Sequence, residues 1–254
     1  MRLRLDELLV ARGLAESRSA AQRLVLEGKV RVQDVPVPKP GNAYPEDVGI
    51  EILAPERFVS RGGEKLEGAF AAFGLNVEGL SCLDVGASTG GFTDCLLQHG
   101  AARVIALDVG HDQFHPRLRA DSRVTVIEKF NARNMTPADL PYVPEFAVCD
   151  VSFISLRLIL PSMAAVVAPG SGLVTLIKPQ FEAGREKVGR GGVVRDEATR
   201  LEVVEAIREF GGSIGLIWNG VSVSPITGPK GNVEYTAHWT KPTHPKSSIA
   251  RFLC

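Results

Sequence analysis

This sequence has no excess of charge of either sign. Its 254 residues carry 29 Lys and Arg and 29 Asp and Glu, so the formal net charge at pH 7 is zero. Binding to nucleic acid therefore requires a local basic patch and cannot rest on bulk charge. Long apolar runs are also absent: none approaches the ~20 residues that span a bilayer, and the start shows no signal-peptide core. We expect a soluble, cytoplasmic protein without a membrane segment.

Cysteine is scarce, with four residues at positions 82, 95, 149 and 254 and no Cys-x-x-Cys pair. Three lie in apolar runs, which is typical of buried thiols in a reducing compartment and excludes a disulfide scaffold. His111 and His115 are four residues apart but offer only two ligands, and no larger His, Cys and carboxylate cluster is visible. The sequence therefore predicts no metal site.

One stretch organises the rest: Leu80-Ser-Cys-Leu-Asp-Val-Gly-Ala-Ser-Thr-Gly-Gly-Phe92. An apolar run, a glycine turn and the helical residues 92–99 predict a buried strand, a tight turn and a helix. Glycines here let the backbone approach a ligand closely, and they are Gly86, Gly90 and Gly91. Their spacing differs from the Gly-x-Gly-x-x-Gly of NAD enzymes. It resembles motif I of class I S-adenosylmethionine methyltransferases, so we assign the glycines and Asp84 to a cofactor site.

A second apolar strand, Arg103–Val109, contains Asp108 at its end. An acid about 20 residues beyond the glycine turn is where such folds bind the hydroxyls of a ribose. The alternative is an aspartate that caps a helix. Asn131 follows the third strand, 124–127. The resemblance to class I methyltransferases implies that Asn131, with Asp150, lies beside the adenine or the sulfonium of the same ligand.

The alternation of strands and helices continues to the end of the chain. Further strands are predicted at 146–150, 172–178, 213–218 and 234–239, with helices at 156–167 and 197–210. This pattern predicts an α/β fold with a doubly wound, mainly parallel sheet. Functional groups gather at the carboxyl ends of such strands, where Asp150 and Lys178 stand. A purely structural Lys–Asp pair at the sheet edge is the alternative.

Residues 1–53 differ from the rest in their sequence pattern, which combines short helical and strand segments and predicts a small α+β domain. Leucines at helical spacing precede Ser17, which suits the N-cap of a helix at 18–26, and an alternating strand follows at 29–33. The stretch resembles the αL RNA-binding motif of a ribosomal protein, pseudouridine synthases and tyrosyl-tRNA synthetases. Its candidate phosphate-binding residues are Arg4, Arg18, Arg23, Lys29 and Arg31. On charge alone, a solvated helix face is the alternative.

A glycine-rich segment, 181–194, follows Lys178 directly and carries Arg185, Lys187 and Arg190. We interpret it as a substrate loop that contacts RNA, the alternative being an ordinary flexible basic loop. The predicted organisation is an RNA-binding domain at 1–53, a linker at 54–60, a catalytic domain at 61–242 and a tail at 243–254.

Several blocks are specific in combination: Arg61-Gly-Gly-Glu-Lys65, Asp84–Phe92, Cys149–Ile154, Leu176–Glu182, Gly191–Asp196 and Gly231–Tyr235. Together they resemble the hemolysin-A-like (TlyA) family of ribosomal RNA 2′-O-methyltransferases, which is related to the FtsJ type. The likeness runs from Met1 to about Lys241 and covers both domains.

The resemblance implies a seven-stranded class I methyltransferase sheet and the catalytic tetrad Lys65, Asp150, Lys178 and Glu234. It also implies methyl transfer from S-adenosylmethionine to a ribose 2′-hydroxyl of ribosomal RNA, with cytidine as the nucleotide and ribosomal subunits as partners. Lys178 is our first choice for the group that receives the hydroxyl proton. The choice of Glu234 rests on the resemblance alone.

Three other functions stay open at this point. An NAD-dependent oxidoreductase is disfavoured by the glycine spacing. A non-catalytic rRNA-binding or ribosome assembly factor would leave the catalytic domain idle, which an intact tetrad argues against. A membrane-acting cytolysin is suggested by the name of the family and disfavoured by the absence of a spanning segment.

Overall fold

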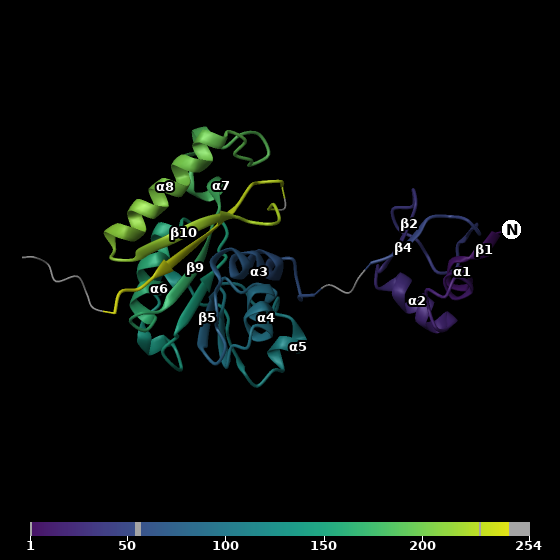
Figure 1. Cartoon of the computed structure of the whole chain (residues 1–254), viewed down its shortest axis with the longest axis horizontal. Coiled ribbons are helices and arrows are strands. Elements are labelled where there is room, and N and C mark those ends of the chain that lie inside the picture. The colour runs from purple at the N-terminus through teal and green to yellow at the C-terminus, as the bar shows by residue number, and fades with distance from the viewer. Residues whose placement is uncertain (1, 54–56, 229, 244–254) are drawn as a thin grey trace, which may run out of the picture. The chain divides into compact units, whose positions relative to one another are not determined.

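The computed structural model describes residues 2–53, 57–228 and 230–243. The chain divides into two compact units, residues 1–57 and residues 58–254, which are described one at a time (Figure 1). Of the predicted linker, residues 54–56 lie outside the described residues, and Phe58 is already buried against Gly63 in the second unit. Of the predicted tail, 243–254, only Thr243 is among the described residues.

The first unit is a small α+β fold built from two short helices and two two-stranded ribbons. Its elements are β1 (Arg2–Arg4), α1 (Leu5–Ala11), α2 (Arg18–Leu26), β2 (Val30–Val32), β3 (Ala43–Pro45) and β4 (Ile50–Ile52). β1 pairs antiparallel with β3, and β2 pairs antiparallel with β4. Leu5, Leu8 and Leu9 of α1 are buried in one core with residues of α2 and both ribbons, so the leucine spacing indicated the correct face of α1.

The start of α2 follows its predicted cap. The Ala20 N–H donates a hydrogen bond of 3.2 Å to Ser17 Oγ, which satisfies one of the free amides of the first turn. Gly28 follows the helix with φ of +70°, and Asp34 adopts φ of +59° in the turn after β2. These two left-handed residues reverse the chain where the sequence predicted breaks.

The second unit is a three-layer α/β structure around a seven-stranded sheet. Its strands are β5 (Ser81–Val85), β6 (Arg103–Leu107), β7 (Val124–Ile127), β8 (Phe146–Cys149), β9 (Gly172–Ile177), β10 (Ile217–Val223) and β11 (Tyr235–Thr240). They lie in the order β10-β11-β9-β8-β5-β6-β7. The strands from β5 to β9 are parallel, and β11 is antiparallel to both β9 and β10. The predicted doubly wound, mainly parallel sheet is therefore confirmed.

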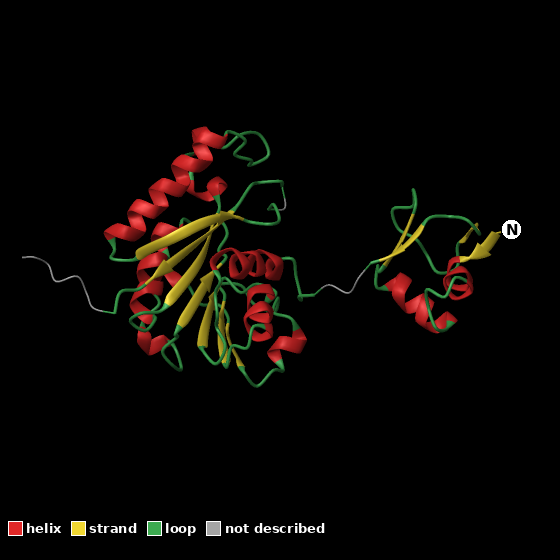
Figure 2. Ribbon diagram, in the orientation of Figure 1, coloured by secondary structure: helices red, strands yellow, loops and turns green. Residues whose placement is uncertain are grey.

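Helices cover both faces of this sheet (Figures 1 and 2). One face carries α3 (Gly62–Phe73), α4 (Gly91–Gln98) and α5 (Pro116–Arg119), and the other carries α6 (Leu160–Val166) and α8 (Glu197–Ser213). The short elements are α7 (Pro179–Glu182), η1 (Ala132–Asn134), η2 (Pro137–Asp139), η3 (Leu156–Leu158) and η4 (Arg185–Lys187). All five residues of β5 are buried, as expected for a central parallel strand covered on both faces. Cys82, Cys95 and Cys149 are buried as predicted.

Two predicted elements were wrong in their bounds. The sixth strand, predicted at 213–218, is β10 at Ile217–Val223, because α8 continues past Gly211 to Ser213. Gly211 faces the ring of the buried Trp239, and a β-carbon there would clash with it, so this glycine permits packing and does not end the helix.

The predicted helix at 156–167 is divided into η3 and α6. Pro161 has no N–H to donate to the carbonyl of Arg157, which interrupts a continuous helix at that point. Among the described residues, no helix combines the length and apolar character needed to cross a membrane.

Candidate active site

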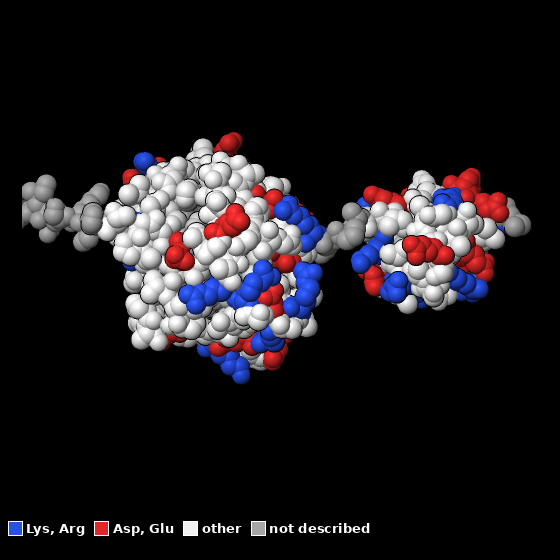
Figure 3. All heavy atoms as spheres, turned by 60° about the horizontal axis from the view of Figure 1, so that its bottom comes forward, with Lys and Arg blue, Asp and Glu red and all other residues white. Residues whose placement is uncertain are grey.

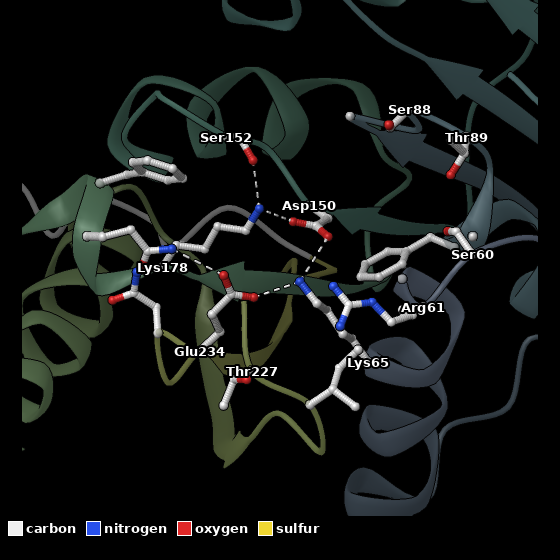
Figure 4. A pocket seen from close by; sticks show the side chains of 18 of the residues that line it. Ser60, Arg61, Lys65, Ser88, Thr89, Asp150, Ser152, Lys178, Thr227 and Glu234 are labelled. Atoms are coloured by element: carbon white, nitrogen blue, oxygen red, sulfur yellow. Dashed lines mark hydrogen bonds and ion pairs between the residues drawn. The ribbon is translucent and has the colours of Figure 1, made fainter. Parts of the chain in front are cut away.

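A cavity of about 730 Å³ opens in the second unit where the carboxyl ends of the central strands meet the first turn of α3 (Figure 4). Its wall includes the turn after β5, the residues after β8 and β9, and the segment that leads into β11. This is where ligands bind in doubly wound sheets. The volume lies in the range of small-molecule and cofactor sites.

The four predicted catalytic residues meet in this cavity. Lys65 Nζ lies 2.6 Å from Glu234 Oε2 and 3.6 Å from Asp150 Oδ2, and Lys178 Nζ lies 2.5 Å from Asp150 Oδ1. The two lysines and Glu234 are buried, with 8%, 7% and 1% of their surfaces exposed, and Asp150 is half-buried. The structure therefore brings together a side chain of α3 with side chains that directly follow β8 and β9 and directly precede β11, up to 169 residues apart in the chain.

Positive and negative groups alternate around this cluster. Asp150 lies between the two lysines, and Lys65 lies between the two carboxylates. Lys178 also donates a hydrogen bond of 2.9 Å to Ser152 Oγ, and Gln180 Nε2 donates one of 3.2 Å to Glu234 Oε1. These contacts fix both ends of the network, as the dashed lines in Figure 4 show.

The glycine turn borders the cavity through Gly86 and Gly91. Gly86 has φ of +84°, and a β-carbon there would lie 2.7 Å from the carbonyl oxygen of Asp150. A β-carbon at Gly91 would clash with Ser60 Oγ at the start of the unit. Gly90, with φ of +96°, faces Leu118 instead of the cavity. Close backbone approach thus serves packing within the protein as well as access to a ligand.

The two strand-end acids differ in their surroundings. Asp84 is fully buried beneath the turn, where it accepts a hydrogen bond of 2.7 Å from Thr93 Oγ1, and burial raises the pKa of its carboxyl to about 7. Asp108 accepts hydrogen bonds from the backbone N–H groups of Ser88 and Gly110, at 2.8 and 2.6 Å. It lies in a small separate hollow beside the glycine turn, not in the wall of the large cavity.

Asn131 lies in neither hollow. Its side chain is exposed and accepts a hydrogen bond of 3.1 Å from the N–H of Arg133, which caps η1. The structure assigns it this capping contact, and a contact with a bound ligand stays a prediction.

Sequence reasoning missed several residues that line the cavity. They are Ser60, Arg61, Ser152, Phe153, Gln180, Phe181, Lys230 and Asn232. Phe153 stands out because it is 91% exposed and adopts φ of +63°, a strained conformation for an aromatic residue. Its ring centroid lies 5.0 Å from that of Phe181. The sequence feature that could have identified Phe153 is its position, three residues after Asp150 at the end of a strand.

The predicted RNA-contacting residues of the first unit are largely in ion pairs. Arg4 and Arg18 bind Asp6, Lys29 lies 3.0 Å from Glu27, and Arg31 lies 3.2 Å from Glu51. Arg23 is exposed on α2. Figure 3 accordingly shows blue and red atoms interleaved over the smaller unit.

The three basic residues of the segment 181–194 in the second unit have different surroundings. Arg185 and Arg190 are exposed, whereas Lys187 lies 2.6 Å from Glu202. Asn232 holds the end of this loop, since its side chain accepts from the Val194 N–H and donates to the Gly192 carbonyl. The loop is therefore tied to the segment that carries Glu234.

Comparison with protein families agrees with this geometry. The family model described as FtsJ-like methyltransferase matches residues 58–241, which is more than half of the chain and contains the whole cavity. The chain belongs to the FtsJ-like methyltransferase family. A second family model, the S4 domain, matches residues 3–42 of this FtsJ-like methyltransferase, within the first unit.

Relatives of this FtsJ-like methyltransferase resemble it over nearly its whole length. Bacillus subtilis YqxC, described as a candidate rRNA methyltransferase, is 48% identical over 92% of this chain and 84% of its own. The 16S/23S rRNA (cytidine-2′-O)-methyltransferase TlyA of Mycobacterium tuberculosis is 45% identical over 92% of this chain and 88% of its own. A solved structure described as a candidate hemolysin of Streptococcus thermophilus has a TM-score of 0.75 and 42% identity, covering 98% of this chain and 91% of that one. The resemblance to the TlyA family is confirmed.

Proposed function

We propose that this FtsJ-like methyltransferase transfers a methyl group from S-adenosylmethionine to the 2′-hydroxyl of a cytidine ribose in ribosomal RNA. The observation that carries the proposal is the cluster of Lys65, Asp150, Lys178 and Glu234 at the wall of a ligand-sized cavity. The names of the relatives supply the nucleotide and the class of RNA.

The residues present suit S-adenosylmethionine as methyl donor. Gly86 and Gly91 line the cavity with backbone atoms alone. We propose that Gly86 and Gly91 border the methionine part, that Gly90 and the buried Asp84 hold the turn in shape, and that Asp108 and Asn131 lie toward the adenosine. A sulfonium-bound methyl group is already activated, so the protein needs to align the acceptor and manage one proton.

Lys178 is the group that we propose to receive that proton. A ribose hydroxyl is a weak nucleophile, and its oxygen bonds to the methyl carbon as the sulfur–carbon bond breaks. Lys178, an ammonium ion-paired with Asp150 Oδ1 at 2.5 Å, first gives a proton to solvent. The neutral amine then accepts the hydroxyl proton, and Asp150 stabilises the ammonium that forms again. Glu234 accepts from Lys65 and Gln180, and it thereby holds these two side chains at the cavity wall. Alignment of the two reactants supplies much of the rate.

Phe153 offers an aromatic surface for the base of the target nucleotide. Single-stranded RNA bases stack on exposed aromatic rings, and Phe153 lines the cavity with its ring almost fully in solvent. We propose that the base stacks there while its ribose enters the cavity. Exposed Arg23, Arg185 and Arg190 supply cations for the RNA backbone, and Arg4, Arg18, Lys29, Arg31 and Lys187 contribute only as RNA phosphates compete with their carboxylate partners. In this scheme residues 1–53 bind RNA and residues 61–242 carry out the transfer.

Mass-spectrometric mapping of ribose methylation in rRNA tests the proposal. Ribosomal subunits that lack the modification are incubated with S-adenosylmethionine and either the intact chain or its Lys178→Ala variant. We expect one new 2′-O-methylated cytidine with the intact chain and almost none with the variant. Tight binding to rRNA without any new methylated ribose would favour the assembly-factor function instead.

A further inference from the structure

A second cluster of reactive side chains lies between α3 and α4, away from the cavity. It consists of Glu67 from α3, Cys95 from α4 and His99, which follows α4 as its C-cap, and the ligand atoms of all three lie within 4.8 Å of one another. None of the three lines the cavity. Glu67 and Cys95 are 28 residues apart, so no local spacing indicated that Glu67 joins the other two.

The geometry of this cluster is close to that of a tetrahedral metal centre. Cys95 and His99 are four residues apart at the end of α4 and its C-cap, where the His99 N–H donates to the Cys95 carbonyl, so their side chains lie on the same side. Glu67 Oε2 lies 3.8 Å from Cys95 Sγ and 2.7 Å from His99 Nε2. Usual Zn–S, Zn–N and Zn–O bond lengths place tetrahedral ligand atoms roughly 3.4–3.6 Å apart. The sulfur and oxygen are thus near the required spacing, and the His99–Glu67 contact needs to open by less than about 1 Å.

The surroundings suit an ion with an open coordination position. Cys95 is buried, while the side chains of His99 and Glu67 are 28% and 32% exposed, so solvent reaches the cluster from one side. The Phe70 ring stacks on the His99 ring at 4.0 Å, which fixes the imidazole plane. A thiolate with an imidazole and a carboxylate is a donor set for Zn²⁺ and similar ions, not for Mg²⁺ or Ca²⁺.

We propose that Glu67, Cys95 and His99 bind one Zn²⁺-class ion, with water as the fourth ligand. Binding releases the Cys95 thiol proton to solvent, since the thiolate is the ligand. The ion would join α3 to α4. Because α3 carries Lys65 and α4 begins at Gly91, it would also hold together two helices that supply residues to the cavity wall.

Titration of the full chain with Co²⁺, a spectroscopic substitute for Zn²⁺, tests the site directly. We expect a thiolate-to-metal charge-transfer absorption that saturates at about one equivalent per chain. Cys95→Ser should abolish this absorption. Cys82→Ser, which removes another buried cysteine on β5, should retain it and serves as the matched control. Absence of the absorption in the intact chain, or its persistence in Cys95→Ser, would overturn the proposal.

A second readout does not depend on removal of a cysteine. Zn²⁺ that binds only the folded chain raises its melting temperature, and Glu67→Gln keeps the shape of the side chain while removing the anionic ligand. We expect Zn²⁺ to raise the melting temperature of the intact chain and to have little effect on Glu67→Gln. An equal rise in both proteins would place the ion elsewhere and refute the site. Neither readout requires methyl transfer.

Discussion

Each unit of this protein buries a carboxylate among cations, and the two networks are built from different partners. In the first unit, fully buried Asp6 accepts hydrogen bonds from Arg4, Arg18 and Gln22. In the second unit, Asp150 and Glu234 face two lysines at the wall of a cavity. The first network consists of arginines around one acid, and the second alternates lysines with two acids.

The difference separates a network that holds structure from one that can perform chemistry. A guanidinium stays protonated under all ordinary conditions and binds a carboxylate with a rigid fork of donors. Its hydrogen bonds, those of Arg4 first, hold the pKa of Asp6 well below the usual range of a carboxyl. A lysine is a compact charge that can give up and accept a proton. Only the second network therefore combines an exchangeable proton with space for a substrate.

Removal of the proposed proton acceptor should produce the largest effect. Lys178→Ala is expected to lower single-turnover methylation by ~10²–10⁴-fold, the usual range for a general base, with little change in cofactor or RNA affinity. Lys178→Arg should fail to restore turnover because a guanidinium cannot accept the proton. Rapid-quench kinetics measures the single-turnover rate of each variant, and calorimetry measures its affinity for the cofactor. An arginine variant that turns over at the rate of the intact chain would reduce Lys178 to an orienting group.

The corresponding change in the first unit should affect stability instead of chemistry. Asp6→Asn is expected to destabilise the first unit by about 1–3 kcal/mol, because buried partners lose a charged acceptor. Faster hydrogen exchange in α1 and α2 of the full chain, with unchanged exchange in β5, would confirm it. A loss of single-turnover rate with saturating RNA would contradict the purely structural assignment.

Acid should weaken the same contacts in the unsubstituted chain. The pKa of Asp6 is lower in the folded state than in the unfolded state, so its stabilising contribution is complete above the ordinary carboxyl pKa. That contribution is lost as the pH falls from there toward the folded-state pKa. The exchange difference between the intact chain and Asp6→Asn should therefore shrink on acidification.

A matched pair of glutamines allows a finer comparison. Gln180 donates to Glu234 at 3.2 Å, and Gln22 donates to Asp6 at 2.7 Å. Gln180→Ala is expected to slow methyl transfer by about tenfold, the lower end of the effect expected from one hydrogen bond to a charged group, which contributes on the order of 1.5–3 kcal/mol. Gln22→Ala should lower the stability of the first unit and leave the rate at saturating RNA unchanged. Equal effects of both variants on rate would remove the distinction between the networks.

The smallest effect concerns cations outside both networks. Arg23 is exposed on α2, whereas Arg31 lies 3.2 Å from Glu51. Arg23→Ala should weaken RNA binding a few-fold and reduce the magnitude of the salt slope by about one. Arg31→Ala should change the slope less, because its charge is already partly compensated. RNA affinity measured at several salt concentrations compares the two variants. A larger change of the salt slope in Arg31→Ala than in Arg23→Ala would show that RNA displaces Glu51 from Arg31.

Features that depend on neighbouring residues could be predicted from the sequence. The alternation of apolar runs and turns gave the parallel strands from β5 to β9, and Ser17 marked the start of α2. Asp150 and Lys178 were identified because they follow apolar strands, and parallel strands place their carboxyl ends at one edge. Lys65 was assigned through the tetrad that the resemblance implies, and Glu234 rested on that resemblance alone.

Features that depend on which distant segments meet were decided only by the tertiary structure. The basic residues of the first unit were predicted as an RNA patch, but folding places Arg4 and Arg18 against Asp6 and Arg31 against Glu51. Charge count carries no information on such pairing, because it depends on the path of the backbone between the partners. The same reason explains why the exposure of Phe153 and the cluster at Glu67 were missed. Local sequence determines where strands, turns and caps form, and packing determines which side chains meet and which remain in solvent.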